Sequence, residues 1–365
     1  MELTKCKLGE LITQRREKND GSDLPICGVS KDGLIPPKQK DADTSIYNVF
    51  YRDDFIFNPA RMELNSIAIN DMYDRAICSS LYEVFYVHRT DLLLPHYLEL
   101  IIRQKWFTRY CKFLGQGSAR EYCRFGNISE IEIEFPPIEE QQKIVEYNTA
   151  IENRIALKQK INDNLLNSVQ AIFRSWFVDY DPFDGVCPSN WETGCVEDIA
   201  EFFDSMRKPL SSLERADMER IYPYYGAVSI VDYVDDYIFD GEYLLVSEDG
   251  IYVVDENGHP LIQHISGKFW ANNHAHILKG KAGFNEDSLY LFLANTNMAP
   301  IVTGAAQPKI NQANLKNFPI TTPDSETMLK FNNIIQPFFD QRLTNESEIK
   351  KLEALQSLLL TRLVD

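Results

Sequence analysis

Two histidines two residues apart, His274 and His276, stand in a β-prone stretch of the chain. Side chains at this spacing share one face of a strand, and two imidazoles on one face can hold a metal ion. The sequence offers no third histidine, cysteine or carboxylate at a convincing short spacing. The pattern therefore favours strand histidines whose ring nitrogens bond to neighbouring groups, and it predicts neither a metal site nor a cofactor.

Acidic doublets raise the separate question of a metal-dependent nuclease, which uses carboxylates to hold ions at a phosphate. They are Asp53 with Asp54, Asp235 with Asp236, and Glu248 with Asp249. The spaced pattern of acidic residues and a lysine that such a nuclease needs is not evident, and isolated acidic doublets usually lie in solvated turns. The sequence therefore does not predict a nuclease site.

A DNA methyltransferase would need a pocket for the methyl donor, commonly with a glycine-rich turn, and a short Asn/Asp-Pro-Pro-aromatic motif that holds the extruded base. Here Asp181-Pro182-Phe183 lacks the second proline, and Pro136-Pro137 lacks the preceding Asn or Asp. No glycine-rich turn follows a predicted strand in the required way. We predict no catalytic residues, although a methyltransferase remains one alternative.

The framework that must position these residues repeats itself at a constant spacing of 187 residues. In each copy an irregular loop leads past a proline into a long heptad pattern. Such a repeat is typical of two similar halves joined head to tail. The matched residues are Gly117, Ala119, Asn127 and Pro136 in the first copy and Gly304, Ala306, Asn314 and Pro323 in the second.

The heptads are the clearest sign of regular structure. An apolar a/d seam over several heptads in each copy is typical of a coiled coil. Both seams are polar in the middle, at Lys158 with Asn162 and at Arg342 with Asn345. Polar seam residues lower stability but fix register and partner, so we expect the two helices to pair with each other, antiparallel. The apolar seam residues are Ile144, Ile151, Ile155, Leu165, Val169 and Ile172, and Phe331, Ile335, Phe338, Ile349, Leu352 and Leu359.

Prolines and acidic residues mark where each long helix begins. Pro137 disfavours helix before it, and Glu139 and Glu140 suit a first turn, where the peptide dipoles favour negative charge. The first helix extends to about Phe177, roughly 50 Å at 1.5 Å per residue. The sequence predicts a globular domain at 1–137, a spacer helix at 138–184, a second domain at 185–321 and a second spacer helix at 322–365. The alternative is that each helix lies separately on its own domain.

Short β-prone runs and single helices alternate within both globular domains. This mixture predicts an α+β fold with small twisted sheets, and the two paired helices would relate the halves by a pseudo-twofold axis. The expected strands are 54–57, 66–69 and 81–87 in the first domain and 243–246, 251–254 and 276–278 in the second. The expected helices lie around 97–110 and 289–295.

Composition limits the class of protein. The chain has 365 residues, of which 44% are hydrophobic, enough for two ordinary cores. It has no long apolar run, so no membrane span is expected. No secretory signal is recognisable, and seven scattered cysteines without a CxxC pair indicate reduced thiols in a cytoplasmic protein. The net charge is −17, with −10 of it in residues 186–320, so the chain alone should not bind DNA tightly.

Several longer segments form recognisable motifs. The central ones are FPPIEEQQKIV at 135–145 and AIFRSWFVDYDPF at 171–183. The second half adds YPYYGA at 222–227, LLVSEDG at 244–250, WANNHAHIL at 270–278 and TGAAQPKINQANL at 303–315. Together these segments resemble the specificity subunits of type I restriction-modification systems. The first domain resembles the family less closely, and LPICGVS at 24–30 is its nearest counterpart of YPYYGA.

This resemblance implies a non-catalytic protein that reads double-stranded DNA. The two globular domains would be target recognition domains, each docked in the major groove of one half of a split target, and the paired helices would fix their separation. The partners implied are two DNA adenine methyltransferase subunits and, in some complexes, restriction and translocase subunits. A coiled-coil scaffold whose domains bind only protein shares the heptad pattern and explains the acidity more easily, so it stays as the other alternative.

The resemblance also directs attention to side chains that can read bases. Major-groove readout uses Arg or Lys for guanine, Asn or Gln for adenine and small apolar groups against the thymine methyl. In the second domain the candidates are Tyr224, Tyr225, Ser247, Gln307, Lys309, Asn311 and Gln312. In the first domain they are Lys38, Arg61, Gln116, Ser118, Arg120, Tyr122 and Arg124.

Overall fold

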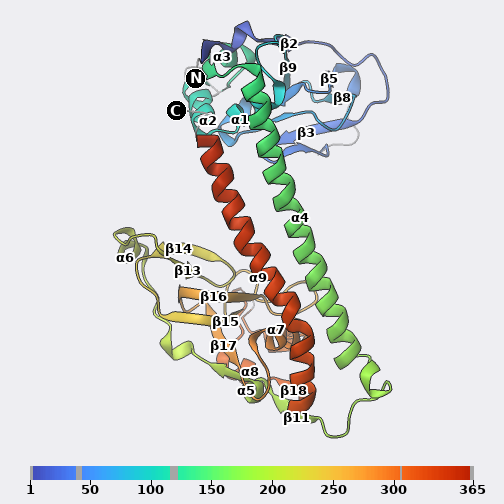
Figure 1. Ribbon diagram of the computed structural model, residues 1–365, viewed down its shortest axis with the longest axis vertical. Helices are drawn as coiled ribbons and strands as arrows, with labels where there is room; N and C mark the ends of the chain where they lie inside the picture. Colours follow the sequence, from blue (N-terminus) through green and yellow to red (C-terminus); the bar gives the residue numbers. More distant parts are fainter. Residues whose placement is uncertain (1–2, 38–42, 116–121, 305, 362–365) are drawn as a thin grey trace. The chain divides into compact units, whose positions relative to one another are not determined.

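The computed structural model describes residues 3–37, 43–115, 122–304 and 306–361 (Figure 1). The chain divides into two compact units, which are 1–158 with 348–365 and 159–347. Both are mixtures of helix and strand, as the sequence predicts. Each unit contains part of both long helices. No helix among the described residues is long and apolar enough to span a membrane.

The first unit contains two four-stranded sheets, ordered β2-β9-β6-β7 and β4-β3-β8-β5, and a separate β1-β10 pair. Its helices α1 and α2 pack on one apolar core together with the β2-β9-β6-β7 sheet. The strands are β1 (Thr4–Lys7), β2 (Ile12–Arg15), β3 (Ile26–Ser30), β4 (Gly33–Ile35), β5 (Asn48–Tyr51), β6 (Phe55–Phe57), β7 (Ile67–Ile69), β8 (Arg75–Cys78), β9 (Glu83–Val87) and β10 (Glu132–Phe135). The helices are α1 (Pro95–Ile102), α2 (Lys105–Gly115), α3 (Phe125–Ser129) and the short 3-10 helices η1 (Leu8–Glu10), η2 (Thr44–Ile46) and η3 (Pro59–Leu64).

The second unit is built on one six-stranded sheet, ordered β12-β17-β15-β16-β13-β14, with a separate β11-β18 pair. Helix α7 packs against strands of this sheet (Figure 1). The strands are β11 (Glu192–Cys195), β12 (Ala200–Phe202), β13 (Tyr222–Tyr225), β14 (Ile230–Val234), β15 (Phe239–Ser247), β16 (Ile262–Ala271), β17 (Ala275–Gly280) and β18 (Pro319–Thr322). The helices are α5 (Val196–Ile199), α6 (Ser212–Ala216), α7 (Glu286–Ala294), α8 (Gln312–Lys316) and the 3-10 helices η4 (Asp181–Phe183), η5 (Asp204–Met206) and η6 (Ala299–Ile301).

The two units share one strand order. In the second, β12 pairs with β17, β17 with β15, β15 with β16, and β13 lies parallel to β16 and antiparallel to β14. In the first, β2 pairs with β9, β9 with β6, β6 with β7, β5 with β8, and β3 lies parallel to β8 and antiparallel to β4. The long β15–β16 hairpin therefore corresponds to two shorter ladders, β6–β7 and β5–β8.

A kink at Asp53 separates these two ladders. Asp53 has a positive φ of 66°, a conformation that L residues rarely adopt. Its neighbour Asp54 is 1% exposed and accepts hydrogen bonds from Arg15 Nε at 2.6 Å and Tyr51 N at 2.8 Å. This buried ion pair holds the chain where the first unit's hairpin bends, and one extended sheet becomes two.

The long helices are α4 (Ile138–Phe177) and α9 (Ser325–Thr361), close to the predicted starts and to the predicted end of the first. Buried Gln141 fixes the start of α4, because its side chain accepts from Leu94 N and donates to Leu92 O and Pro136 O. Asp324 caps α9 by accepting from the backbone N–H groups of Glu326 and Thr327.

The helices pair antiparallel within each unit. In the first unit Gln356 Nε2 donates to Asn148 Oδ1 at 3.1 Å, and Lys158 pairs with Glu348 at 2.6 Å. In the second, Asn345 Nδ2 donates to Asn162 Oδ1 at 2.8 Å. Of the polar seam residues singled out in the sequence, Lys158, Asn162 and Asn345 meet partners on the other helix, whereas Arg342 pairs with Glu346 of its own helix. The predicted pairing is confirmed by these contacts.

The predicted apolar seam is buried or half-buried throughout. In the second unit, however, Phe173 and Phe339 are more buried than their predicted neighbours Ile172 and Phe338, because they also face the core beside the sheet. The heptad pattern predicts only the contacts between the two helices, so it does not predict this additional contact with the core.

Two local predictions were wrong. The helix expected around 97–110 is two helices, α1 and α2, that break near Arg103 while burying apolar residues in the same core. Residues 251–254 form no strand beyond an isolated bridge between Val254 and Pro260. Gly250 has a φ of 155°, and the side chains of Ile251 and Tyr252 are 82% and 71% exposed, whereas Val253 is 1% exposed and lies in the core.

Candidate functional site

The loop that leads into α8 is held in a closed turn. Thr303 and Lys309 exchange two backbone hydrogen bonds of 2.8 Å. Gly304 has a φ of 83°, and a Cβ there would lie 2.3 Å from the carbonyl oxygen of Gln307, so only glycine fits. Gln307 is exposed at this turn and Lys309 is partly exposed.

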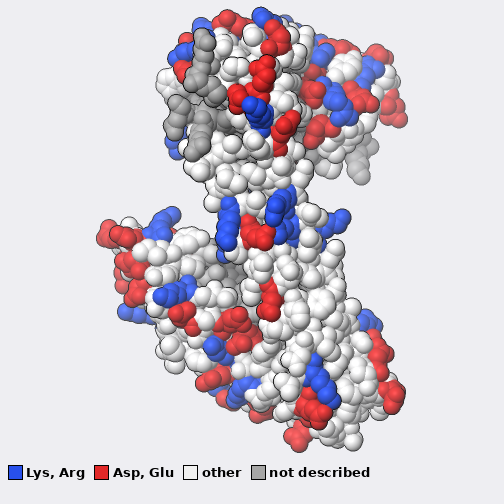
Figure 2. Space-filling model, viewed as in Figure 1, with Lys and Arg blue, Asp and Glu red and all other residues white. Residues whose placement is uncertain are grey.

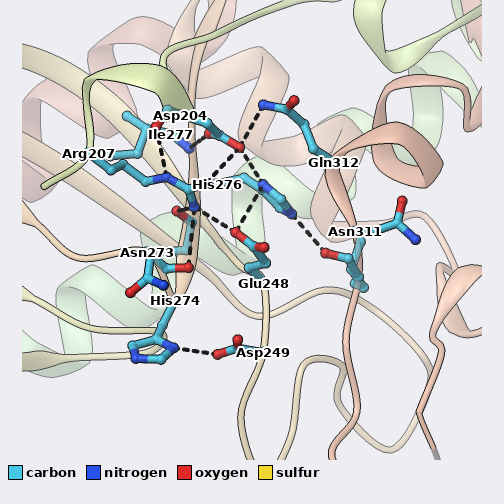
Figure 3. A network of polar contacts seen from close by, with 12 residues as sticks. Asp204, Arg207, Glu248, Asp249, Asn273, His274, His276, Ile277, Asn311 and Gln312 are labelled. Carbon is cyan, nitrogen blue, oxygen red and sulfur yellow. Dashed lines mark hydrogen bonds and ion pairs between the residues drawn. The ribbon is translucent and has the colours of Figure 1, made fainter. Parts of the chain in front are cut away.

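A buried network anchors the far side of this loop (Figure 3). His276 of β17 is fully buried, with Nδ1 2.6 Å from Asp204 Oδ2 and Nε2 2.8 Å from the carbonyl oxygen of Ile310. Asp204 also accepts from Gln312 Nε2 at 2.7 Å, and the backbone N–H of Ile310 donates to Glu248 O at 2.9 Å. Side chains from η5 and β17 and the backbone carbonyl of Glu248, just after β15, thus fix the backbone that presents Lys309 and Gln307.

Two cations neutralise the carboxylates of this network. Arg207 Nη1 donates to Glu248 Oε2 at 2.6 Å and to Ala275 O at 2.6 Å, while Lys309 Nζ lies 3.0 Å from Glu248 Oε1. Burial opposes ionisation of Asp204, but its bonds with His276 and the nearby Arg207 outweigh burial and lower its pKa. The pKa of Glu248 is lowered likewise, since Arg207 and Lys309 outweigh its burial.

The same three residues have the spacing of metal ligands. One ligand atom each of Asp204, Glu248 and His276 lies within 4.8 Å of the others. Yet Arg207 and Lys309 already bond to the Glu248 oxygens, and His276 bonds through both ring nitrogens. This donor set fits an ion-pair network better than a cation site.

Four segments of the second unit, one of them the loop before α8, meet at one surface. His274, in the turn between β16 and β17, lies with Nδ1 2.5 Å from Asp249 Oδ1, and Asp249 forms a β-bridge with Lys309. Gln263 Nε2 donates to the carbonyl oxygens of Gly226 and Ala227. The chain at 226–228, 249–252, 273–274, 303–304 and 306–309 therefore forms one surface, to which Ile251 and Tyr252 contribute exposed side chains.

Only some of the predicted contact residues of the second domain reach this surface. Gln307 and Lys309 do so, and Tyr225 is half-buried with its ring edge-on to Phe269. Asn311 caps α8 by accepting from Asn314 N, and Gln312 bonds to Asp204. Both of these side chains hold the loop.

Two predicted contacts are corrected by burial. Tyr224 is 1% exposed, and its hydroxyl accepts from Leu210 N at 2.9 Å. Ser247 is 0% exposed inside the sheet. Alternation along a strand decides which side chains face outwards, and both of these residues face the core.

The corresponding surface of the first unit is a cleft of about 950 Å³. It is lined by the β3–β4 turn, by η3, by the β8–β9 turn and by residues before α3, the counterparts of the four segments above. Arg61, Tyr122 and Arg124 are among its lining residues. Lys38, Gln116, Ser118 and Arg120 lie outside the described residues.

Glu83 anchors the cleft as His276 anchors the second site. It accepts from the backbone N–H of Phe125 at 2.8 Å, from Arg124 Nη1 at 3.3 Å and from Gln14 Nε2 at 3.3 Å. A side chain from β9 therefore fixes the start of α3, just as one from β17 fixes the loop before α8. The two anchors perform the same task with different chemistry.

Sequence reasoning missed the residues contributed by the turn between the last two sheet strands. These are Asn273 and His274 in the second unit and Ser79 and Ser80 in the first. The polar pair Asn272-Asn273 between two β-prone runs was a recognisable turn signal. Asp204 and Arg207 carried no such signal, because their partners lie some 40 to 108 residues away in the sequence.

A family description matches most of the chain. The type I restriction modification DNA specificity domain matches it twice, at residues 6–167 and 188–355.

Individual relatives agree with this match. A putative type I restriction enzyme specificity subunit of Haemophilus influenzae is 38% identical over 128 residues, which cover 35% of this chain and 32% of that protein. The MjaIX specificity subunit of Methanocaldococcus jannaschii is 24% identical over 299 residues, or 75% of this chain and 69% of that one. The match thus spans about a third of the Haemophilus protein.

One solved structure has the same fold. The S subunit of a type I restriction-modification system from M. genitalium superposes with a TM-score of 0.60 at 14% identity. The superposition covers 99% of this chain and 96% of that one.

Proposed function

Because the chain belongs to the type I restriction modification DNA specificity domain family, which it matches twice, we propose that it reads a split DNA sequence. Each unit would contact one half of the target. The proposal is carried by the repeated geometry, in which the same four segments of two similar sheets converge on a loop before a short helix. One such surface displays an amide and an ammonium group, which are groups suited to base edges.

In the second domain we propose that Gln307 and Lys309 contact bases and that Asn273 and His274 complete the surface. Gln307 is exposed, and Lys309 lies beside it with its ammonium group held by Glu248. Amides pair with adenine and ammonium groups with guanine or phosphate. Ile251 and Tyr252 would add apolar surface against thymine methyl groups.

We propose further that the chain is non-catalytic and acts with partners. These would be two DNA adenine methyltransferase subunits and, where present, restriction and translocase subunits. The net charge of −17 supports a need for partners, because a protein that holds DNA alone usually shows a basic surface. Figure 2 shows acidic and basic side chains interspersed, with acidic ones gathered near the α6–β14 end of the second unit.

The domain limits we propose remain 1–137 and 185–321 for the target recognition domains and 138–184 and 322–365 for the spacers. A helix of 40 residues is about 60 Å long. If α4 and α9 set the distance between the domains, lengthening both by one turn should change the spacer in the target and leave both half-sites alone. An unchanged spacer would reject this role.

The decisive experiment replaces residues 185–320 by those of a relative with a different target and maps DNA methylation in the host cell. A DNA reader changes one half-site only, whereas a protein scaffold leaves the methylated sequence unchanged. Replacing Gln307 and Lys309 with alanine should weaken the preference for the bases of the same half-site, by about 1–3 kcal/mol of binding free energy per lost base contact. Calorimetry of the purified chain with the methyl donor tests the methyltransferase alternative, and binding would contradict a non-catalytic role.

A further inference from the structure

The cleft of the first unit has the dimensions of a ligand site. Its volume of about 950 Å³ lies at the upper end of the range that such clefts usually span. The lining combines small polar groups, Ser30 and Ser80, with exposed Leu81 and with the cationic side chains of Lys31 and Arg61. A concave surface of this composition suits a ligand that is both anionic and partly apolar.

Two of the three cationic residues that line the cleft, Lys31 and Arg61, differ from most other cations in the globular part of the first unit. Most basic side chains there are held by a partner. Those held are Lys5, Lys7, Arg15, Arg16, Lys18, Arg52, Arg75, Arg89, Arg103 and Arg124. The side chains of Lys31 and Arg61 make no hydrogen bond or ion pair with any described residue. The others of which this is true, Lys105, Arg109 and Lys112, lie together on α2.

Backbone hydrogen bonds fix the position of the Arg61 main chain, from which its guanidinium group extends. The N–H of Arg61 donates to Asn58 O at 2.9 Å, and its carbonyl oxygen accepts from Ser66 N at 3.3 Å. Its φ and ψ of −135° and 22° depart from helical values inside η3. The main chain of Arg61 is therefore held at the cleft wall while its side chain has no partner among the described residues.

We propose that Arg61 reads a guanine of the first half-site from this cleft and that Lys31 contacts a neighbouring phosphate. This inference rests on the proposed function, that the chain reads DNA. A guanidinium fork matches the O6 and N7 acceptors of guanine, and this pairing is the commonest specific contact in the major groove. A lysine ammonium is a point charge that suits a phosphate.

The second site lacks such a free cation among its described residues. Its Lys309 already lies 3.0 Å from Glu248, and Arg207 is 13% exposed and committed to Glu248 and Asp204. A guanine contact by an unpaired guanidinium group is therefore assigned to the first half-site. In the second, the contacts come from Gln307, from Lys309, which Glu248 already holds, and from apolar side chains.

The test uses the full chain assembled with its two methyltransferase subunits and a duplex that carries the target found in the host methylome. Arg61→Ala should lower affinity about 5- to 150-fold, the loss expected for one bidentate base contact, and relax the first half-site at one position. Arg61→Lys should keep the charge but lose the preference for guanine. Replacing that guanine with 7-deazaguanine, which lacks the N7 acceptor, should weaken the unmodified chain and have no further effect on Arg61→Ala.

The Lys31 contact is tested separately, through the salt dependence of binding, and has a matched control variant. Lys31→Ala should weaken binding to all sequences alike and reduce the salt slope of log K by about 1. Arg89→Ala removes the same charge from a residue outside the cleft that is paired with Asp91, and it should change neither sequence preference nor 7-deazaguanine sensitivity. Melting curves for each variant separate loss of folding from loss of readout.

Some outcomes would overturn the proposal. A first half-site without guanine would do so, as would full retention of its preference in Arg61→Ala. If instead the unmodified assembly shows no sequence preference at all, the proposed function fails, and the two failures are thereby distinguished.

Discussion

The two units share one strand order but hold their candidate recognition loops by different chemistry. In the second unit a buried histidine and an aspartate fix the loop through Ile310 and Gln312. In the first unit the carboxylate of Glu83, whose side chain is 15% exposed, bonds directly to Phe125 N and Arg124. Their free charges differ as well, since Arg61 and Lys31 have no side-chain partner among the described residues, whereas Lys309 is paired. The framework is thus conserved within the molecule while anchors and reading groups vary independently.

The buried anchor of the second unit should be the more costly to remove. Replacing His276 with alanine removes one partner of the Asp204 carboxylate, which keeps Gln312 and Arg207, and the side-chain partner of the Ile310 carbonyl oxygen. The expected cost is about 3 kcal/mol, the lower end for breaking a buried pair. We expect loss of readout of the second half-site, with the first half-site retained. Chemical denaturation and methylome mapping measure both effects.

His274 provides the control for this change. It is the same residue type two positions away, but its side chain is 48% exposed. Replacement with alanine should change stability by less than about 0.5 kcal/mol, as for ordinary surface positions. Equal destabilisation by both substitutions would contradict the role assigned to burial.

Helix α7, which packs against the sheet of the second unit, contains a buried ionisable group. Asp287 of α7 has its pKa raised to about 7 by burial and by nearby Glu242 and Asp340. An acid whose folded pKa is raised contributes stability at low pH that is lost as pH rises from about 4 through 7. Asp287→Asn should therefore equal the unmodified protein near pH 4 and exceed its stability at pH 8 by up to about 4 kcal/mol.

His264 affects the same experiment in the opposite direction. Burial lowers the pKa of His264 to about 4, so its contribution to stability is lost as pH falls from about 6.5 towards 4. His264 Nδ1 lies 3.5 Å from Asp287 Oδ1, so the substitution also changes the His264 term, and below about pH 6.5 the difference reports the coupled pair. Between about pH 6.5 and 8 the difference reports Asp287. A difference that stays constant from pH 4 to pH 8 would show that Asp287 titrates normally.

The anchor of the first unit should be weaker. Replacing Glu83 with alanine leaves the Phe125 N–H without its acceptor and removes the partner of Arg124, at a cost of about 1–3 kcal/mol. We expect the sequence preference at the first half-site to weaken while that at the second is unchanged. This is the opposite of the result expected for the His276 substitution. If either substitution altered both half-sites, the two units would not read independently.

The smallest effect concerns the amide pair between the helices of the second unit. Asn345→Leu alone leaves half-buried Asn162 without this partner and should cost about 1–3 kcal/mol. The double change Asn162→Leu with Asn345→Leu should be nearly neutral, because an apolar pair of similar size replaces a buried polar one. A double-mutant cycle by urea unfolding gives the coupling, and the Gln356–Asn148 pair of the first unit allows the same comparison.

Local periodicity was sufficient to predict the long helices, their antiparallel pairing and the repeated halves. The heptad pattern and the proline boundaries are properties of neighbouring residues, so they can be read without knowing the fold. The same reasoning placed Gln307 and Lys309 on a turn that Gly304 makes possible. It failed at 251–254, where Ile251 and Tyr252 are exposed and Val253 is buried, without a strand between them.

What the sequence by itself determined is therefore the framework, since helical repeats, breaks and the spacing of 187 residues are encoded over short distances. Only the tertiary structure decided which polar groups face outwards. It buried Tyr224 and Ser247, and it joined His276 to Asp204, 72 residues away. The physical reason is that burial and ion pairing depend on contacts between distant segments, which no local pattern records.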